Sequence, residues 1–277
     1  MRVYTLVEGS SRKGTGFLPD DGLSLYFEYG GHRVLFDTGA TDAFIYNATL
    51  LGIDLSKVDT CVISHAHGHH TGGLPNFLEI NDHATVYMKS ETKGDFYMRR
   101  PFHMDQCGID PELFHKYEDR IRLIDDDMEI FEGVTAASIR NHRKPPIYTT
   151  LLYERRGDEF TRDTLAHELY LAIRTSAGTI VLTGCSHNGI INILHCAEDR
   201  FGKVVGVIGG FHLDGARVMG LRYRAEPTLE VRAIARYFNE HNIKHIYTGF
   251  CTGRKALERL ELFSTTQQVQ SGDVVDI

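Results

Sequence analysis

Four histidines within six residues constrain this chain more than any other feature. They lie in the segment His65–His70, directly after the apolar run Val62-Ile63 and just before the pair Gly72-Gly73. Imidazole is the commonest metal ligand among protein side chains. This density therefore predicts a metal site. The alternatives are a solvent-exposed histidine-rich loop and an expression tag, and the position in mid-chain after a β-like run argues against a tag.

The spacing within the segment indicates how it could hold an ion. In an extended backbone His65 and His67 point to the same side, so both can bind one cation. Gly68 then permits a turn, after which His69 and His70 could face the same cavity. Catalytic zinc sites keep about three protein ligands and one position for water. Because the segment supplies two or three ligands, at least one must come from elsewhere in the chain.

The composition excludes several classes of protein. The chain has 277 residues, of which 42% are hydrophobic, and a net charge of −7. It therefore lacks the basic surface that nonspecific nucleic-acid binding needs. No apolar run approaches the roughly 18–20 residues of a membrane span, and residues 1–7 are too short and too quickly polar for a signal peptide. Five cysteines without a CxxC spacing suit a reducing compartment. We therefore expect a cytoplasmic protein without nucleic-acid or membrane partners.

Hydrophobic periodicity predicts strands in both halves of the chain, each half with its own helices. The expected strands are Arg2–Glu8, Ser24–Tyr29, Arg33–Asp37, Thr60–Ser64, Thr85–Lys89, Leu169–Arg174, Thr179–Thr183, Val204–Ile208 and Ile243–Thr248. The expected helices are Asp42–Gly52, Ile190–Arg200, Thr228–His241 and Lys255–Phe263. Residues 91–160 are expected to form an irregular insertion with short helices around 110–118. The pattern favours one domain over residues 1–277, built as a two-sheet core covered by helices.

Several motifs together resemble the metallo-β-lactamase superfamily, whose motif is His-x-His-x-Asp-His before x-Gly-Gly. The matching segments are Ser64–Gly73, Val34–Gly39, Thr183–Gly189, Gly209–Leu213 and Tyr247–Gly253. They are most similar to the branch that contains archaeal dihydropterin ribofuranosylaminobenzene 5′-phosphate synthases and many uncharacterised metal-dependent hydrolases. The resemblance implies an α/β fold, a four-layer αββα sandwich with the metal site at one edge between the two sheets.

The resemblance also implies roles for single residues. His65 and His67 match the pair that holds the first metal, and His187 matches the third histidine of this site. The alternative for His187 is a polar residue that caps a helix. Asp37 matches an aspartate that orients a ligand histidine through its free ring N–H. The alternative for Asp37 is an ordinary turn residue.

The second metal site of the family is altered in this chain. His70 matches one of its ligands, but the motif's aspartate is His69 here, and the family's terminal histidine is Phe250. Cys185 occupies the position of a bridging aspartate, either as a thiolate ligand or as a small buried side chain. We therefore predict one well-formed site and a second that is weakened or lost. His69 then becomes a candidate general base.

The function implied is that of a metal-dependent hydrolase or transferase that uses metal-activated water on a small substrate. Zn²⁺ is the expected ion, although nitrogen ligands also suit other divalent transition metals. His212 is a candidate for the substrate pocket, with a satisfied core histidine as the alternative. Basic residues that could meet a substrate phosphate are Arg99, Arg100, Arg140, Arg143, Lys144, Arg217, Arg222 and Arg224. The alternative function is a degenerate member that binds a ligand or metal with little catalysis.

Overall fold

The first of two seven-stranded sheets contains the amino-terminal half of the fold. The computed structural model describes residues 1–140, 151–214, 217–218, 221–222 and 228–277. The strands of the first sheet are β1 (Arg2–Val7), β2 (Ser24–Tyr29), β3 (His32–Phe36), β4 (Thr60–Val62), β5 (Thr85–Lys89), β8 (Ile121–Ile124) and β20 (Val274–Asp276), in the order β20-β1-β2-β3-β4-β5-β8. β2 and β3 form a hairpin whose turn is Gly30-Gly31, and both glycines have the positive φ that a tight turn requires.

The second sheet repeats this plan with strands from the middle and the end of the chain. Its strands are β9 (Met128–Phe131), β10 (Val134–Ser138), β13 (Leu169–Thr175), β14 (Gly178–Thr183), β15 (Val204–Ile208), β18 (His245–Thr248) and β19 (Thr266–Gln268), in the order β19-β18-β15-β14-β13-β10-β9. In each sheet an antiparallel part continues into a parallel part, which begins at β3 in the first sheet and at β14 in the second.

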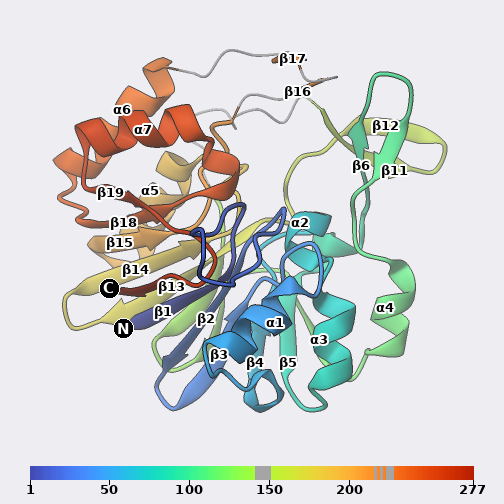
Figure 1. Cartoon of the computed structure of the whole chain (residues 1–277). Coiled ribbons are helices and arrows are strands. Elements are labelled where there is room, and N and C mark those ends of the chain that lie inside the picture. Colours follow the sequence, from blue (N-terminus) through green and yellow to red (C-terminus); the bar gives the residue numbers. More distant parts are fainter. Residues whose placement is uncertain (141–150, 215–216, 219–220, 223–227) are drawn as a thin grey trace.

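Helices cover the outer faces of both sheets, as Figure 1 shows. The helices beside the first sheet are α1 (Ala43–Leu50), α3 (Leu74–Ile80) and α4 (Pro111–Lys116), and those beside the second are α5 (Ile190–Phe201), α6 (Thr228–Glu240) and α7 (Arg254–Phe263). The one-turn helix α2 (Gly68–Thr71) lies at the sheet edge, and short 3₁₀ turns cover Leu55–Lys57, Ser90–Lys93 and Phe250–Thr252. None of the described helices has the length and apolar character that crossing a bilayer requires.

Three separate apolar cores explain the layers. One core, around Phe27, Phe36 and Leu171, lies between the two sheets. A second lies between the first sheet and its helices and includes Phe44 and Phe77, and a third, around Phe238, joins the second sheet to α5, α6 and α7. A sheet that is apolar on both faces must be covered on both faces. The predicted αββα sandwich is therefore confirmed.

The region 91–160 is more regular than the sequence predicted. It contains β8, β9 and β10, which belong to the two main sheets, so the expectation of an irregular insertion over the whole region was wrong. The predicted short helix near 110–118 is α4. A separate four-stranded sheet contains β6 (Asp95–Arg99), β7 (Met104–Gln106), β11 (Leu152–Arg156) and β12 (Glu159–Arg162), and it extends from one end of the sandwich (Figure 1). A two-stranded ribbon pairs β16 (Arg217–Val218) with β17 (Leu221–Arg222).

The parallel strands determine where the functional side chains meet. Asp37 directly follows β3, and the histidine segment begins three residues after β4 ends. Cys185, His212 and Cys251 follow the carboxyl ends of β14, β15 and β18 in the other sheet. Ligands of α/β sheets bind outside the carboxyl ends of parallel strands. Two such edges therefore come together at one end of this molecule.

Candidate metal centre

Three histidines from the two sheets surround one point. The ring centroids of His65, His67 and His187 lie 4.8–4.9 Å from one another, and all three side chains are buried. His67 Nδ1 lies 3.2 Å from His187 Nε2. Two nitrogens bound to one tetrahedral zinc lie about 3.3 Å apart, given Zn–N bonds of about 2.0–2.1 Å. We call these residues the three-histidine group; the spacing of His67 Nδ1 and His187 Nε2 suits one bound cation.

Two nitrogens of this group have no partner within the described part of the chain. His65 Nε2 and His187 Nδ1 are buried and accept or donate no hydrogen bond. Burying an unsatisfied polar atom costs about 1–3 kcal/mol. Buried polar groups in native proteins are nearly always satisfied, so such atoms require an explanation. A cation bound by His65 Nε2 would supply it for that atom. The possible ligand atoms of His65, Cys185 and His187 lie within 4.8 Å of one another, so the residues present fit a metal ion.

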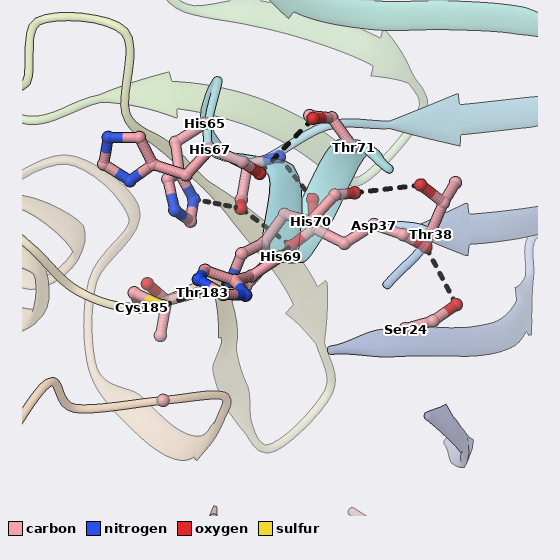
Figure 2. A network of polar contacts seen from close by, with 12 residues as sticks. Ser24, Asp37, Thr38, His65, His67, His69, His70, Thr71, Thr183 and Cys185 are labelled. Carbon is pink, nitrogen blue, oxygen red and sulfur yellow. Dashed lines mark hydrogen bonds and ion pairs between the residues drawn. The ribbon is translucent and has the colours of Figure 1, made fainter. Parts of the chain in front are cut away.

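Asp37 connects two of the histidines, as Figure 2 shows. Its Oδ2 accepts hydrogen bonds from His70 Nδ1 at 2.7 Å and from the Ser64 hydroxyl at 2.7 Å. Ser64 Oγ in turn lies 2.8 Å from His65 Nδ1. Since the Ser64 proton goes to Asp37, His65 Nδ1 must be the donor to Ser64. The Nε2 atoms of both His65 and His70 therefore keep a lone pair for a metal.

The local backbone allows this arrangement only with a glycine opposite it. A Cβ at Gly184 would overlap the Ser64 hydroxyl and lie 2.9 Å from His65 Nδ1. Asp37 itself has a φ of +59°, which is uncommon outside glycine. The Ser24 hydroxyl donates to the Asp37 carbonyl at 2.8 Å and holds this turn in place (Figure 2).

A second carboxylate, Asp163, orients His67, and the sequence analysis missed it. Asp163 Oδ2 lies 3.4 Å from His67 Nε2 and 3.1 Å from His167 Nε2. The Ala66 N–H donates to His167 Nδ1 at 3.2 Å, so the proton of His167 is on Nε2. With its Nε2 facing the carboxylate, His67 presents Nδ1 to His187. Asp163, His167 and His67 also form a possible ligand group of their own.

Glu168 supports His187 and was also missed. The buried carboxylate accepts the backbone N–H of His187 at 2.7 Å and that of Asn188 at 2.8 Å. Burial raises the pKa of Glu168. Asp163 and Glu168 lie in the irregular segment between β12 and β13, where no periodicity marks them. The only signal in the sequence is that two acidic residues flank His167.

Burial keeps the ligand histidines neutral. It lowers the pKa of His67 to about 4 and lowers those of His65 and His187 well below the usual value, with smaller effects from neighbouring histidines. Burial also raises the pKa of Asp163, but the hydrogen bonds from His167 and His67 outweigh it and lower that pKa overall. At neutral pH the group therefore consists of uncharged imidazoles, the form that binds metal.

The residues predicted for the second metal do not form one group. His70 Nε2 lies 3.1 Å from Cys185 Sγ, and both are buried (Figure 2). The His69 side chain is 38% exposed, and its Nδ1 donates to the Asp21 carbonyl at 2.9 Å. The Phe250 ring lies 5.7 Å from that of His69 and 6.0 Å from that of His70. His69 therefore lies on the cavity wall, apart from His65 and His67.

His212 and Cys251 lie beside Cys185 instead. The possible ligand atoms of these three residues lie within 4.8 Å of one another, and we call them the thiol group. The His212 ring is 4.2 Å from that of His187, which places the thiol group next to the three-histidine group. Burial raises the pKa of the Cys185 thiol well above its usual value. A cation must therefore displace the thiol proton to bind there.

Both groups line one cavity of about 840 Å³. The small sheet closes it on one side through Met98, Arg99 and Leu152, so part of the 91–160 region shapes the pocket. Of the predicted phosphate contacts, Arg99 and Arg100 line this cavity, whereas Arg140 pairs with Asp126 outside it. Arg143, Lys144 and Arg224 lie outside the described residues, as do the side chains of Arg217 and Arg222.

The chain is similar in sequence and in fold to several known proteins. The family profile described as the metallo-β-lactamase superfamily matches residues 18–185. The 7,8-dihydropterin-6-methyl-4-(β-D-ribofuranosyl)-aminobenzene-5′-phosphate synthase of Methanocaldococcus jannaschii is 29% identical over 92% of this chain and 89% of its own length. The crystal structure of Tm1679, described as a metal-dependent hydrolase of the β-lactamase superfamily, is similar with a TM-score of 0.81 and 28% identity, over 100% of this chain and 99% of that one.

A more distant structure shares the fold alone. A diphosphatase from the PhnP family matches with a TM-score of 0.53 and 16% identity, over 99% of this chain and 97% of that one. The family profile covers more than half of the sequence, and the histidine segment that begins after β4 lies within it. The chain therefore belongs to the metallo-β-lactamase superfamily, whose members are generally metal-dependent hydrolases.

Proposed function

We propose that this protein is a zinc-dependent hydrolase that acts on a small, phosphorylated substrate. The observation that carries the proposal is the three-histidine group, in which the buried His65 Nε2 lacks any partner among the described residues and His67 Nδ1 lies 3.2 Å from His187 Nε2. The group opens onto a cavity of about 840 Å³, a size that suits a small molecule. A metal site without such a cavity would favour a structural role instead.

Each residue of the group has a distinct part in this proposal. His65, His67 and His187 would hold the ion, while Asp163 orients the His67 ring directly and Asp37 orients the His65 ring through the Ser64 hydroxyl. Three nitrogen ligands with an open position are typical of catalytic zinc. The bound ion would supply a Lewis acid that activates water and polarises the bond to be cleaved.

His69 is the best-placed proton acceptor. Because Nδ1 donates to the Asp21 carbonyl, Nε2 carries the lone pair, and the side chain lines the cavity. A neutral imidazole that faces the cavity can take a proton from a reacting water molecule. His212, which lines the same cavity, would contact the substrate.

The phosphate is proposed from the charge of the cavity. Arg99, Arg100 and Arg254 line it, and Arg100 is held by Asp105 at 2.7 Å. Guanidinium groups bind phosphate oxygens with two parallel hydrogen bonds. The relative from Methanocaldococcus jannaschii is named for a 5′-phosphate product, which favours the same class of substrate here. A group transfer to such a substrate is the transferase form of this proposal.

A second candidate function is favoured by Phe250. This ring occupies the place of a metal ligand in the family motif and cannot bind a cation. The chain would then be a binding protein that retains one ion with little catalysis. Free cysteines at all five positions suit a reducing, cytoplasmic compartment in either case.

Activity on a panel of phosphodiesters, phosphomonoesters and lactones tests the proposal. Metal-free protein, prepared with a chelator, should be inactive and should regain activity with Zn²⁺. The His187→Ala variant should stay inactive, whereas His83→Ala, which removes an exposed histidine far from the cavity, should behave like the unchanged protein. If His187→Ala keeps full activity and metal content, the proposal is wrong. Tight binding of Zn²⁺ without turnover of any panel compound would support the binding protein.

A further inference from the structure

The thiol group lies where three loops of the second sheet meet. Cys185 follows β14, His212 follows β15 and Cys251 follows β18, so neighbouring parallel strands deliver all three residues to one edge. Their ligand atoms lie within 4.8 Å of one another, and all three residues line the cavity. Two sulfurs and one nitrogen thus converge beside the three-histidine group, and the proposed hydrolysis uses neither sulfur.

The packing around Cys251 holds its sulfur in this position. The His212 N–H donates to Cys251 Sγ at 3.3 Å, and Cys251 Sγ lies 3.7 Å from the Cys185 carbonyl oxygen. Gly210 makes room for the sulfur, because a Cβ at that position would overlap Cys251 Sγ. The Gly210 N–H donates to the Gly184 carbonyl at 2.7 Å and ties the two loops together. The arrangement is therefore built by several contacts rather than by one side chain.

We propose that Cys185, His212 and Cys251 form a second metal site, for a cation such as Zn²⁺ that binds thiolate. The inference rests on the proposed function, because it places this ion beside the hydrolytic one in the same cavity. Binding would release two thiol protons, so that two thiolates balance the 2+ charge and the imidazole of His212 remains neutral. A substrate atom or water would complete the four ligands of a tetrahedral ion.

The altered residues of the family motif explain why the second ion would lie here. Phe250 offers no ligand atom, and the Nδ1 atom of His69 is engaged by Asp21. Cys185, in contrast, belongs to two possible ligand groups, one with His65 and His187 and one with His212 and Cys251. Its thiolate could therefore lie between two ions. Thiolate ligands also change the selectivity of the site toward softer cations than carboxylates prefer.

Metal counting on three variants tests this site. The unchanged protein, loaded with Zn²⁺ and freed of excess, should contain about two ions per chain, and Cys251→Ser and His212→Gln about one each. The matched control is Cys107→Ser, which removes another thiol from the cavity wall but not from the group. It should keep two ions. Circular dichroism and thermal melting show whether each variant is folded.

Cobalt provides an independent readout. Loading with Co²⁺ should produce a thiolate-to-cobalt charge-transfer absorption, which should fall by about half in Cys251→Ser and stay unchanged in Cys107→Ser. Equal metal content and absorption in the unchanged protein and Cys251→Ser would overturn the inference. So would a Cys185–Cys251 disulfide in freshly purified protein, found as two fewer free thiols than five.

The outcomes separate this inference from the proposed function. If the unchanged protein holds a single ion that His67→Ala removes, the second site is wrong and the hydrolytic site remains. If it holds no ion at all, both proposals fail. If Cys251→Ser retains one ion and His67→Ala also retains one, the two sites are independent and both proposals are supported.

Discussion

The three-histidine group combines loops of both sheets and the thiol group combines loops of the second sheet alone, and the two groups also differ in the contacts that support them. In the first, Asp163 orients His67 directly and Asp37 orients His65 through the Ser64 hydroxyl, all by buried hydrogen bonds. In the second, backbone atoms and a glycine position the sulfur of Cys251. The fold thus brings side chains to both edges, whereas the residue types decide which chemistry each edge can perform.

Both groups are held by unusual backbone. Positive φ angles occur at Asp37 (59°) and Ser186 (55°) beside the three-histidine group, and at His212 (48°) and Phe250 (31°) beside the thiol group. Residues in sparsely populated conformations cost about 1–3 kcal/mol each and persist where the surrounding structure determines them. The scaffold therefore maintains both edges, although only the first keeps the ligands of the family motif.

Removal of His67 should have the largest effect. We expect His67→Ala to lose activity by more than about 100-fold and to lose the associated ion. Even the removal of a side chain that only hydrogen-bonds a metal ligand lowers metal affinity or activity by about 10–100-fold. Steady-state kinetics and metal analysis on the same samples check this. Retention of this ion in His67→Ala would show that the three-histidine group does not hold it.

His69→Ala should separate catalysis from metal binding. A general base contributes about 10²–10⁴-fold, so we expect kcat to fall by about 100-fold while the metal content stays unchanged. A loss of metal would instead show that His69 is a metal ligand. The three-histidine group and the thiol group would then differ less in their ligands.

Asp163→Asn tests whether the carboxylate matters to the metal. The amide keeps the shape but weakens the hydrogen bond to His67, so the affinity for Zn²⁺ should fall by about 10-fold. Competition with a chromophoric chelator measures this affinity. The matched control is Asp105→Asn, an exposed carboxylate that pairs with Arg100 outside the metal group. Equal Zn²⁺ affinities in Asp163→Asn and Asp105→Asn would show that Asp163 does not support metal binding.

The smallest effect is a pH dependence of stability in the metal-free protein. Burial lowers the folded pKa of His67 to about 4, so below pH 6.5 the unfolded chain binds a proton that the folded chain does not. Stability is therefore lost as the pH falls from 6.5 toward 4. From pH 7 to 5.5 we expect a loss of about 1 kcal/mol from this residue. Urea denaturation of the unchanged protein and of His67→Gln measures the difference, and a pH-independent difference would contradict the assignment.

Some of the site could be predicted because its residues are close together in the sequence. The histidine segment is a local pattern, and a strand followed by a turn places such residues at a sheet edge. The predicted strands and helices were also mostly confirmed, since their periodicity reflects burial of one face. The strands β8, β9 and β10 were missed because short, partly buried segments have weak periodicity.

Other parts of the site depend on contacts between distant segments. Asp163 and Glu168 approach His67 and His187 from an irregular segment, and nothing local marks them as partners. The grouping of His212 and Cys251 with Cys185 arises only when β14, β15 and β18 pair in parallel. The separation of His69 from the other histidines likewise follows from the turn of α2 and the contact with Asp21.

The sequence by itself determined the family, the layered fold and the presence of a metal-binding histidine segment, because each depends on residue types at short spacing. The tertiary structure decided which nitrogens converge, which carboxylates orient them and which thiols lie beside them. These depend on side-chain directions at the ends of strands that are up to about 200 residues apart, such as β3 and β18. Coordination requires atoms within a few ångströms, and only the packed sheets bring them that close.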